Sequence, residues 1–167
     1  IKSNKKIKKS KIFYKNLFLP GSKLNFTNNL LAKNDKKKAA TFISENDFRE
    51  ERSWQELNQN TNKIVQFFKN KKIKKKDRIA AYMPNTIETV EAFLSTAAIG
   101  AIWSSCSPDF GVKGVIERFS QINPKILFIT DQYFYNGKQI NIIDRLPEIL
   151  KAIPSIKNVL VTNYPGK

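Results

Sequence analysis

Short apolar runs alternate with amphipathic helical segments through the second half of the sequence, and this alternation constrains the fold more than any other feature. The runs predict strands at residues 78–83, 101–106, 126–130 and 158–162. Strands separated by helices of ten to fifteen residues build right-handed βαβ units, which place the strands in a parallel sheet with helices on both faces. We therefore predict an α/β fold with a parallel sheet flanked by helices.

The intervening segments carry the helical period. We expect Asn85 to cap a helix that ends at Gly100, with Glu88 and Glu91 together on its exposed face. Further helices are predicted at residues 112–122 and between Gln139 and Ile153. In such sheets ligands bind beyond the carboxyl ends of the strands, so the turns after Met83, Cys106 and Thr130 are the places to search for a site.

The first half of the sequence has weaker signals. An apolar run at residues 39–43 predicts a strand that enters a turn at residues 44–47. Ser53 and Glu56 have the spacing of a capping box, which predicts a helix of four or five turns starting at Trp54.

The net charge of +16 is confined to the same half. Residues 1–78 hold 19 Lys and 3 Arg against 7 acidic residues, whereas residues 79–167 hold 6 Lys and 2 Arg against 7. A basic nucleic-acid-binding protein is therefore one hypothesis. Against it, the lysine runs are not interleaved with aromatic residues that could stack on bases, so we expect no nucleic-acid partner.

Several kinds of catalytic site are excluded by missing residues. The sequence has no His, which rules out within it a Ser/His/Asp triad, a Cys/His dyad and a His-ligated metal. Its one cysteine, Cys106, cannot form an internal disulfide and suits a reducing, cytoplasmic compartment; we expect it to be a small buried apolar side chain. No apolar stretch is long enough for a membrane span, and we expect no catalytic or metal-binding residue.

The segment from Gly100 to Gly111 is the most distinctive. A predicted strand is followed there by small polar residues and then by a glycine that opens a helix. Such a turn offers backbone amides to an anionic ligand. A capped turn explains the pattern equally well, because Ser107 or Asp109 could cap the helix.

Seven blocks of sequence carry a resemblance to a known family. They are Pro20–Phe26, Ser53–Leu57, Lys76–Asn85, Ile99–Ala101, Ile102–Val112, Arg118–Lys125 and Tyr135–Lys138. Together they resemble the acyl-CoA synthetase superfamily of adenylate-forming enzymes, over roughly residues 18 to 162. Within it they are most similar to the acetoacetate–CoA ligases.

The resemblance implies a fold and an activity. Residues 21–167 would form an incomplete N-terminal α/β domain, part of the large domain of an adenylate-forming enzyme, after a lysine-rich segment at residues 1–20 that is either poorly ordered or an entry segment. The implied enzyme converts ATP, acetoacetate and CoA into acetoacetyl-CoA, AMP and pyrophosphate through an acyl-adenylate, with Mg²⁺, in ketone-body and lipid metabolism. The family's ATP-binding and Mg²⁺-binding motifs lie further along such chains, so we expect this segment to be inactive without the remainder of its polypeptide.

The resemblance also implies contacts to CoA. In the related acetyl-CoA synthetases two turns contact the nucleotide end of CoA, and they correspond to Pro108 and Asp109 and to Gly137 and Lys138. The acetyl enzymes have glycines in the first turn and arginines around the second, so Lys138 is the one cation left for a phosphate. An acetate-type or other short-chain acyl-CoA synthetase is the nearest alternative.

Overall fold

The computed structural model describes residues 7–166, and its centre is a four-stranded parallel sheet in the order β10-β7-β5-β6. These strands are β5 (Arg78–Tyr82), β6 (Ile102–Cys106), β7 (Ile126–Thr130) and β10 (Asn158–Thr162). Each coincides with a predicted strand to within one residue. The predicted α/β fold with a parallel sheet is thus confirmed.

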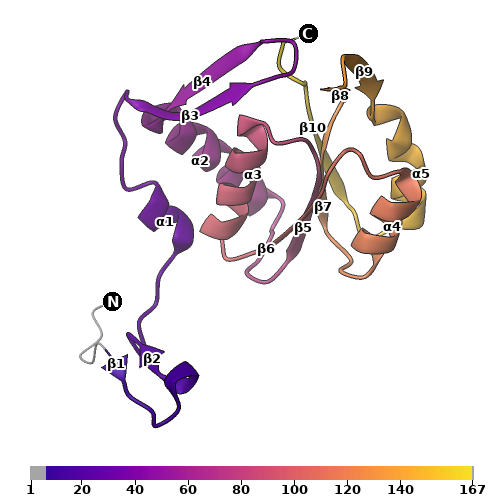
Figure 1. The fold of residues 1–167 in the computed structure, drawn as a ribbon. Coiled ribbons are helices and arrows are strands. Elements are labelled where there is room, and N and C mark those ends of the chain that lie inside the picture. Colours follow the sequence, from indigo (N-terminus) through magenta and orange to yellow (C-terminus); the bar gives the residue numbers. More distant parts are fainter. Residues whose placement is uncertain (1–6, 167) are drawn as a thin grey trace.

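Helices cover both faces of the sheet (Figure 1). On one face lie α2 (Trp54–Asn70) and α3 (Ile87–Ala98), and on the other α4 (Val112–Ser120) and α5 (Leu146–Ala152). The 3-10 helix η2 (Ile143–Arg145) precedes α5, and three antiparallel hairpins and two short helices near the N-terminus lie outside these layers. They are β1 (Ile7–Lys8) with β2 (Leu17–Phe18), β3 (Lys38–Ile43) with β4 (Arg49–Ser53), β8 (Gln132–Tyr135) with β9 (Lys138–Asn141), η1 (Phe13–Lys15) and α1 (Phe26–Leu30).

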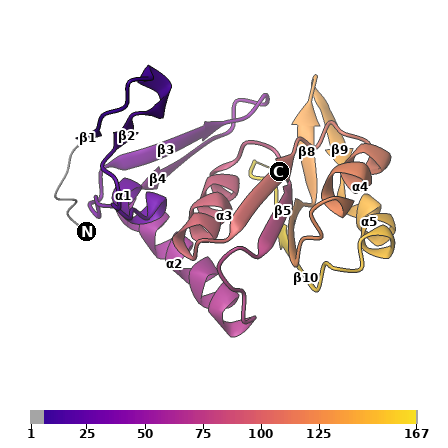
Figure 2. The same ribbon diagram turned by 90° about the horizontal axis from the view of Figure 1, so that it is seen from below.

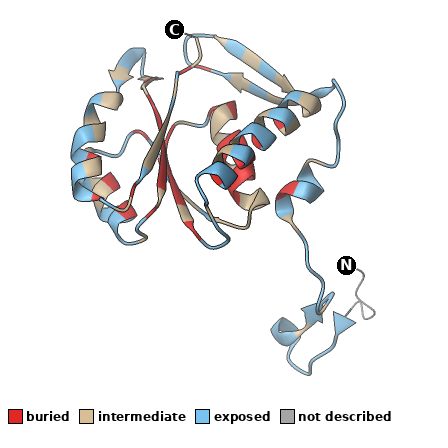
Figure 3. Ribbon diagram, turned by 180° about the vertical axis from the view of Figure 1, so that it is seen from behind, coloured by how far each residue is buried: buried red, intermediate tan, exposed pale blue. Residues whose placement is uncertain are grey.

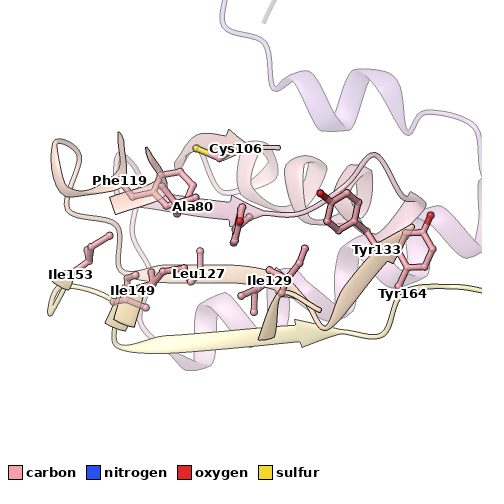
Figure 4. Packing of buried hydrophobic residues seen from close by; sticks show 13 residues of the cluster. Ala80, Cys106, Phe119, Leu127, Ile129, Tyr133, Ile149, Ile153 and Tyr164 are labelled. Atoms are coloured by element: carbon pink, nitrogen blue, oxygen red, sulfur yellow. The ribbon is translucent and has the colours of Figure 1, made fainter. Parts of the chain in front are cut away.

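Alternation along the central strands divides the core into two layers. Ile79 and Ala81 of β5 face Phe68 and Ala92 of the helices α2 and α3. The intervening residues of β5 belong to the second layer, with side chains from β7, α4 and α5 (Figure 4). The members of this layer that Figure 4 labels are Ala80, Cys106, Phe119, Leu127, Ile129, Tyr133, Ile149, Ile153 and Tyr164. Strands buried on both faces explain why β5 and β7 are almost uniformly apolar.

The predicted capping box at the start of α2 is present. Ser53 Oγ accepts a hydrogen bond from the Glu56 N–H at 3.2 Å, and Glu56 Oε2 accepts one from the Ser53 N–H at 2.8 Å. These bonds satisfy free amides of the first turn and fix where α2 begins.

The N-terminal part lies apart from the sheet layers (Figure 2). Its side chains are largely exposed up to α1 (Figure 3), where the Thr27 hydroxyl donates to the Leu94 carbonyl at 2.6 Å. Of the predicted segment at residues 1–20, the structure describes 7–20 as β1, η1, β2 and their connections, and residues 1–6 lie outside the described chain. The boundary at residue 20 stays a prediction.

Two predictions at element ends are wrong. Thr86, not Asn85, is the N-cap of α3, and its side chain makes no capping bond. The predicted helix from Gln139 is shorter, because Lys138–Asn141 pairs with β8, and the helical segment starts with the 3-10 helix η2 (Ile143–Arg145) before α5. No helix in the described range 7–166 has the length and apolar character to cross a membrane.

Candidate functional site

A pocket of about 270 Å³ opens beyond the carboxyl ends of β5 and β6. The segments after β5 and β6 and the strand β8 line it, as predicted for a parallel sheet. The lining residues are Met83, Pro84, Asn85, Thr89, Ser105, Cys106, Ser107, Pro108, Asp109, Tyr133, Phe134 and Tyr135. Pro108 and Asp109, the first pair of residues that the resemblance assigns to CoA, both line this pocket.

The Asp109 carboxylate accepts two hydrogen bonds from other residues that line the pocket. Its Oδ1 accepts a hydrogen bond from the Tyr133 hydroxyl at 2.8 Å, and its Oδ2 accepts one from the Ser107 hydroxyl at 2.7 Å. The N-cap of α4 is Gly111, with no side-chain bond, so the alternative that Ser107 or Asp109 caps this helix is wrong. Asp109 instead ties the turn after β6 to β8.

Burial suppresses ionisation of the tyrosine and the thiol at this end of the sheet. It raises the pKa of Tyr133 to about 12, and the hydrogen bond to the Asp109 carboxylate adds to the effect. Burial also raises the pKa of the Cys106 thiol, which is 4% exposed. Both groups are neutral near pH 7, so Tyr133 serves as a hydrogen-bond donor and Cys106 is no activated nucleophile.

The second predicted turn connects β8 and β9. Asn136 and Gly137 both have positive φ, 51° and 70°, which favours Asn-Gly in a tight hairpin. The Gly137 N–H donates to Glu45 Oε2 at 3.2 Å, and the Lys138 side chain is exposed. The pocket lining includes Tyr135 but neither Gly137 nor Lys138. These two residues follow the lining in sequence and are not part of the pocket wall.

A buried charge cluster on the α2–α3 side overturns one prediction. Glu91 is 5% exposed rather than on a solvated face with Glu88. Its Oε1 accepts from Asn60 Nδ2 at 2.8 Å and lies 3.5 Å from Arg52 Nε, while Arg52 also pairs with Glu50 and Glu88. Burial raises the pKa of Glu91, although Asn60 and Arg52 oppose it. The hairpin strand β4 supplies Arg52, and since this strand was not predicted, neither was the cluster.

No metal centre is formed by the described residues. Among residues 7–166 no group of three or more His, Cys, Asp or Glu side chains is placed to hold an ion.

Comparison with known proteins identifies the family. The family model described as AMP-binding enzyme matches residues 30–166. The chain belongs to the AMP-binding enzyme family. The chain is 41% identical over 146 residues to an acetoacetyl-CoA synthetase of Gallus gallus, a match that covers 86% of this chain and 22% of the relative.

A bacterial relative and a solved structure bear the same name. The chain is 41% identical over 136 residues to an acetoacetyl-coenzyme A synthetase of Rhizobium meliloti, covering 81% of this chain and 21% of that one. The solved structure of an acetoacetyl-CoA synthetase from Streptomyces lividans superposes with a TM-score of 0.83 at 30% identity, covering 91% of this chain and 24% of that one. The chain thus spans about a fifth of the length of the curated relatives it matches.

Proposed function

We propose that this chain is the N-terminal portion of an acetoacetate–CoA ligase. The observation that carries the proposal is the agreement of relatives from animals and bacteria on acetoacetyl-CoA synthetase at about 40% identity. A malonamoyl-CoA synthetase of Penicillium aethiopicum is less similar, at 35%. An acetate-type ligase is the competing proposal for the acid, and the experiment below separates the two.

The proposed reaction has two steps. The acetoacetate carboxylate attacks the α-phosphorus of ATP and releases pyrophosphate, and the CoA thiol then attacks the acyl carbon of acetoacetyl-AMP, so that AMP leaves. The first step would call for Mg²⁺ and cationic groups to neutralise the phosphates. We assign those groups to the remainder of the polypeptide. The substrate would place the enzyme in ketone-body and lipid metabolism, and the single cysteine fits a cytoplasmic location.

The role we propose for the described chain is to bind the nucleotide end of CoA. A pocket of about 270 Å³ is smaller than typical pockets for whole ligands, so it suits one part of the cofactor. The Asp109 carboxylate accepts hydrogen bonds and would face hydroxyl or amino groups of the ligand beside Pro108. Gly137 and Lys138 would meet a phosphate, because Lys138 offers an exposed ammonium group on the neighbouring hairpin.

The test uses the product of the full-length reading frame. Acetoacetate-dependent exchange of pyrophosphate into ATP measures the first step without CoA, and CoA consumption measures the second. We expect exchange and thioester formation with acetoacetate to exceed those with acetate by at least about tenfold in kcat/KM. Higher kcat/KM with acetate would reject the assigned acid, and absence of acid-dependent exchange with every short-chain acid tried would reject the ligase.

A further inference from the structure

Two backbone carbonyls of the turn after β6 contact Tyr82 and Arg145. The Tyr82 hydroxyl donates to the Pro108 carbonyl at 3.1 Å and also contacts the Phe110 carbonyl. Arg145 Nη1 lies within hydrogen-bonding distance of the same two carbonyl oxygens, at 3.1 and 3.3 Å, and also of the Tyr82 hydroxyl oxygen. Residues 63 positions apart in sequence therefore meet at one turn.

Donors and acceptors balance in this group. Arg145 Nη1 carries two hydrogens and the Tyr82 hydroxyl one, which gives three donors. The two carbonyl oxygens and the hydroxyl oxygen provide three acceptors. Only three of the five contacts can form at one time, but each of the three oxygens can then accept one hydrogen bond. A partly buried network satisfied in this way favours a single arrangement of the turn.

Both anchors are themselves held firmly. Tyr82 is fully buried at the end of β5, an interior strand of the sheet. Arg145 is half-buried at the junction of η2 and α5, with its guanidinium carbon 6.0 Å from the centre of the Tyr82 ring. The turn is thus fastened to the sheet and to the α4–α5 layer, and not to its own strand alone.

The pocket side of the same turn is fastened separately. Asp109 lies between Pro108 and Phe110 in sequence, and its carboxylate accepts from Tyr133 and Ser107 on the pocket side. The Pro108 and Phe110 carbonyls are bonded to Tyr82 and Arg145, and the Asp109 carboxylate is bonded separately. Together these contacts fix the orientation of Asp109. A prearranged contact surface lowers the entropic cost of binding a flexible ligand.

We propose that Tyr82 and Arg145 are positioning residues for CoA, which hold the turn at residues 107–110 in the conformation that receives the cofactor. The inference rests on the proposed function, because CoA is the ligand of that function. Neither residue needs to touch CoA or the reacting atoms. Their loss would therefore weaken the thioester-forming step and leave acid adenylation intact.

The two steps of the reaction supply the test in the full-length gene product. For Arg145→Gln we expect the KM for CoA to rise by at least about tenfold, as for loss of a charged hydrogen-bond donor. Acetoacetate-dependent pyrophosphate exchange should stay within about twofold of the wild type, since that step needs no CoA. Arg145→Lys, which keeps the charge, should recover part of the affinity. The matched control Arg49→Gln removes an exposed arginine, paired with Glu51, and should change neither step.

Tyr82→Phe makes the same comparison with the buried ring retained, and should raise the KM for CoA about threefold or more. An equal fall in both steps, or an unchanged KM for CoA in both variants, would overturn the proposal. A wild-type enzyme that activates another acid rejects acetoacetate only, and the comparison is then made with that acid. A wild type without any CoA-dependent turnover rejects both the ligase and the positioning role.

Discussion

The two ends of the parallel sheet differ in charge and in how their polar groups are bonded. At the carboxyl end the pocket of about 270 Å³ is lined mainly by uncharged polar and aromatic side chains, and its one carboxylate is bonded twice. At the amino end a larger hollow of about 450 Å³ is bordered by four cations. These are Lys71, Arg78, Lys125 and Lys157.

Register explains the charge at the amino end. Arg78 begins β5, and Lys125 and Lys157 directly precede the neighbouring strands β7 and β10. Backbone hydrogen bonds of 2.9 Å join Lys125 to Arg78 and Lys157 to Lys125. Lys125 pairs with Asp77 at 2.8 Å, whereas no carboxylate in the described range comes within ion-pairing distance of Arg78 or Lys157. Arg78 instead donates to the Ile122 carbonyl at 2.7 Å and to the Asn123 carbonyl at 3.3 Å. Volume and charge alone therefore do not identify a site.

The largest expected effect comes from breaking the carboxyl end. Tyr82→Ala removes a fully buried ring together with a hydroxyl bonded to the turn, and should lower the free energy of unfolding by about 3–5 kcal/mol. Urea denaturation followed by circular dichroism measures this loss. Lys157→Ala at the amino end should stay within about 0.5 kcal/mol of the wild type. Similar losses for the two variants would remove the contrast between the ends.

Asp77 is a carboxylate at the amino end of the sheet with both a hydrogen bond and an ion pair. It accepts from the Lys74 N–H at 2.8 Å and pairs with Lys125, and these contacts lower its pKa although burial opposes them. Asp77→Asn should therefore cost about 1–2 kcal/mol at pH 7. Because the folded pKa lies below the unfolded value of 3.8, the stabilisation is complete above pH 3.8 and is lost as pH falls through the folded pKa.

Urea midpoints of the wild type and Asp77→Asn, measured from pH 7 down to pH 2, check this sign. The gap between the two proteins should be constant down to about pH 5 and should narrow below pH 4. A gap that widens in acid would contradict the assigned direction of the pKa shift.

Lys138 tests whether charge matters at the periphery of the pocket. Lys138→Gln in the full-length gene product should raise the KM for CoA by about threefold, because an exposed ammonium contributes less than about 1 kcal/mol. The difference from the wild type should shrink at high salt. Lys151→Gln on α5 is the matched control, and an equal effect there would show that only general surface charge is sensed.

The smallest effect is expected from relieving the cation row. Lys157→Glu places a carboxylate beside Lys125 and should raise the free energy of unfolding by about 0.2–1 kcal/mol. Thermal unfolding at low and high salt measures it, and the gain should be larger at low salt. A loss of stability at low salt would mean that the cations do not repel one another.

The sheet could be predicted from the sequence because its strands are buried on both faces and bounded by turns. The phase of α3 could not. A single apolar stripe assumes one buried face, but α3 also contacts α1 and α2, so that Glu91 is buried and Val90 is 42% exposed. The partner that makes Glu91 tolerable, Arg52, lies in a charged hairpin strand without an apolar pattern.

The location of the candidate site could be predicted from the sequence, but the hydrogen bonds around it could not. The sheet pattern indicated the turn after Cys106, and the resemblance singled out Pro108 and Asp109 within it. Nothing in the local pattern indicates that Arg145 reaches the Pro108 carbonyl, because that contact depends on tertiary packing. The β8–β9 hairpin did leave a signal. Asn136-Gly137 between segments rich in Tyr, Phe and Ile is typical of a two-residue hairpin turn, and weighing it above the helical period would have corrected the helix predicted from Gln139.

Cys106 gives this chain a convenient chemical reporter. It is the one cysteine in the sequence, it is buried at the end of β6, and it borders the pocket. A thiol-alkylating reagent can therefore attach at one place only, and it must wait until that end of the sheet opens. The labelling rate then measures how often the pocket wall separates from the strands, and a ligand that fills the pocket should slow it.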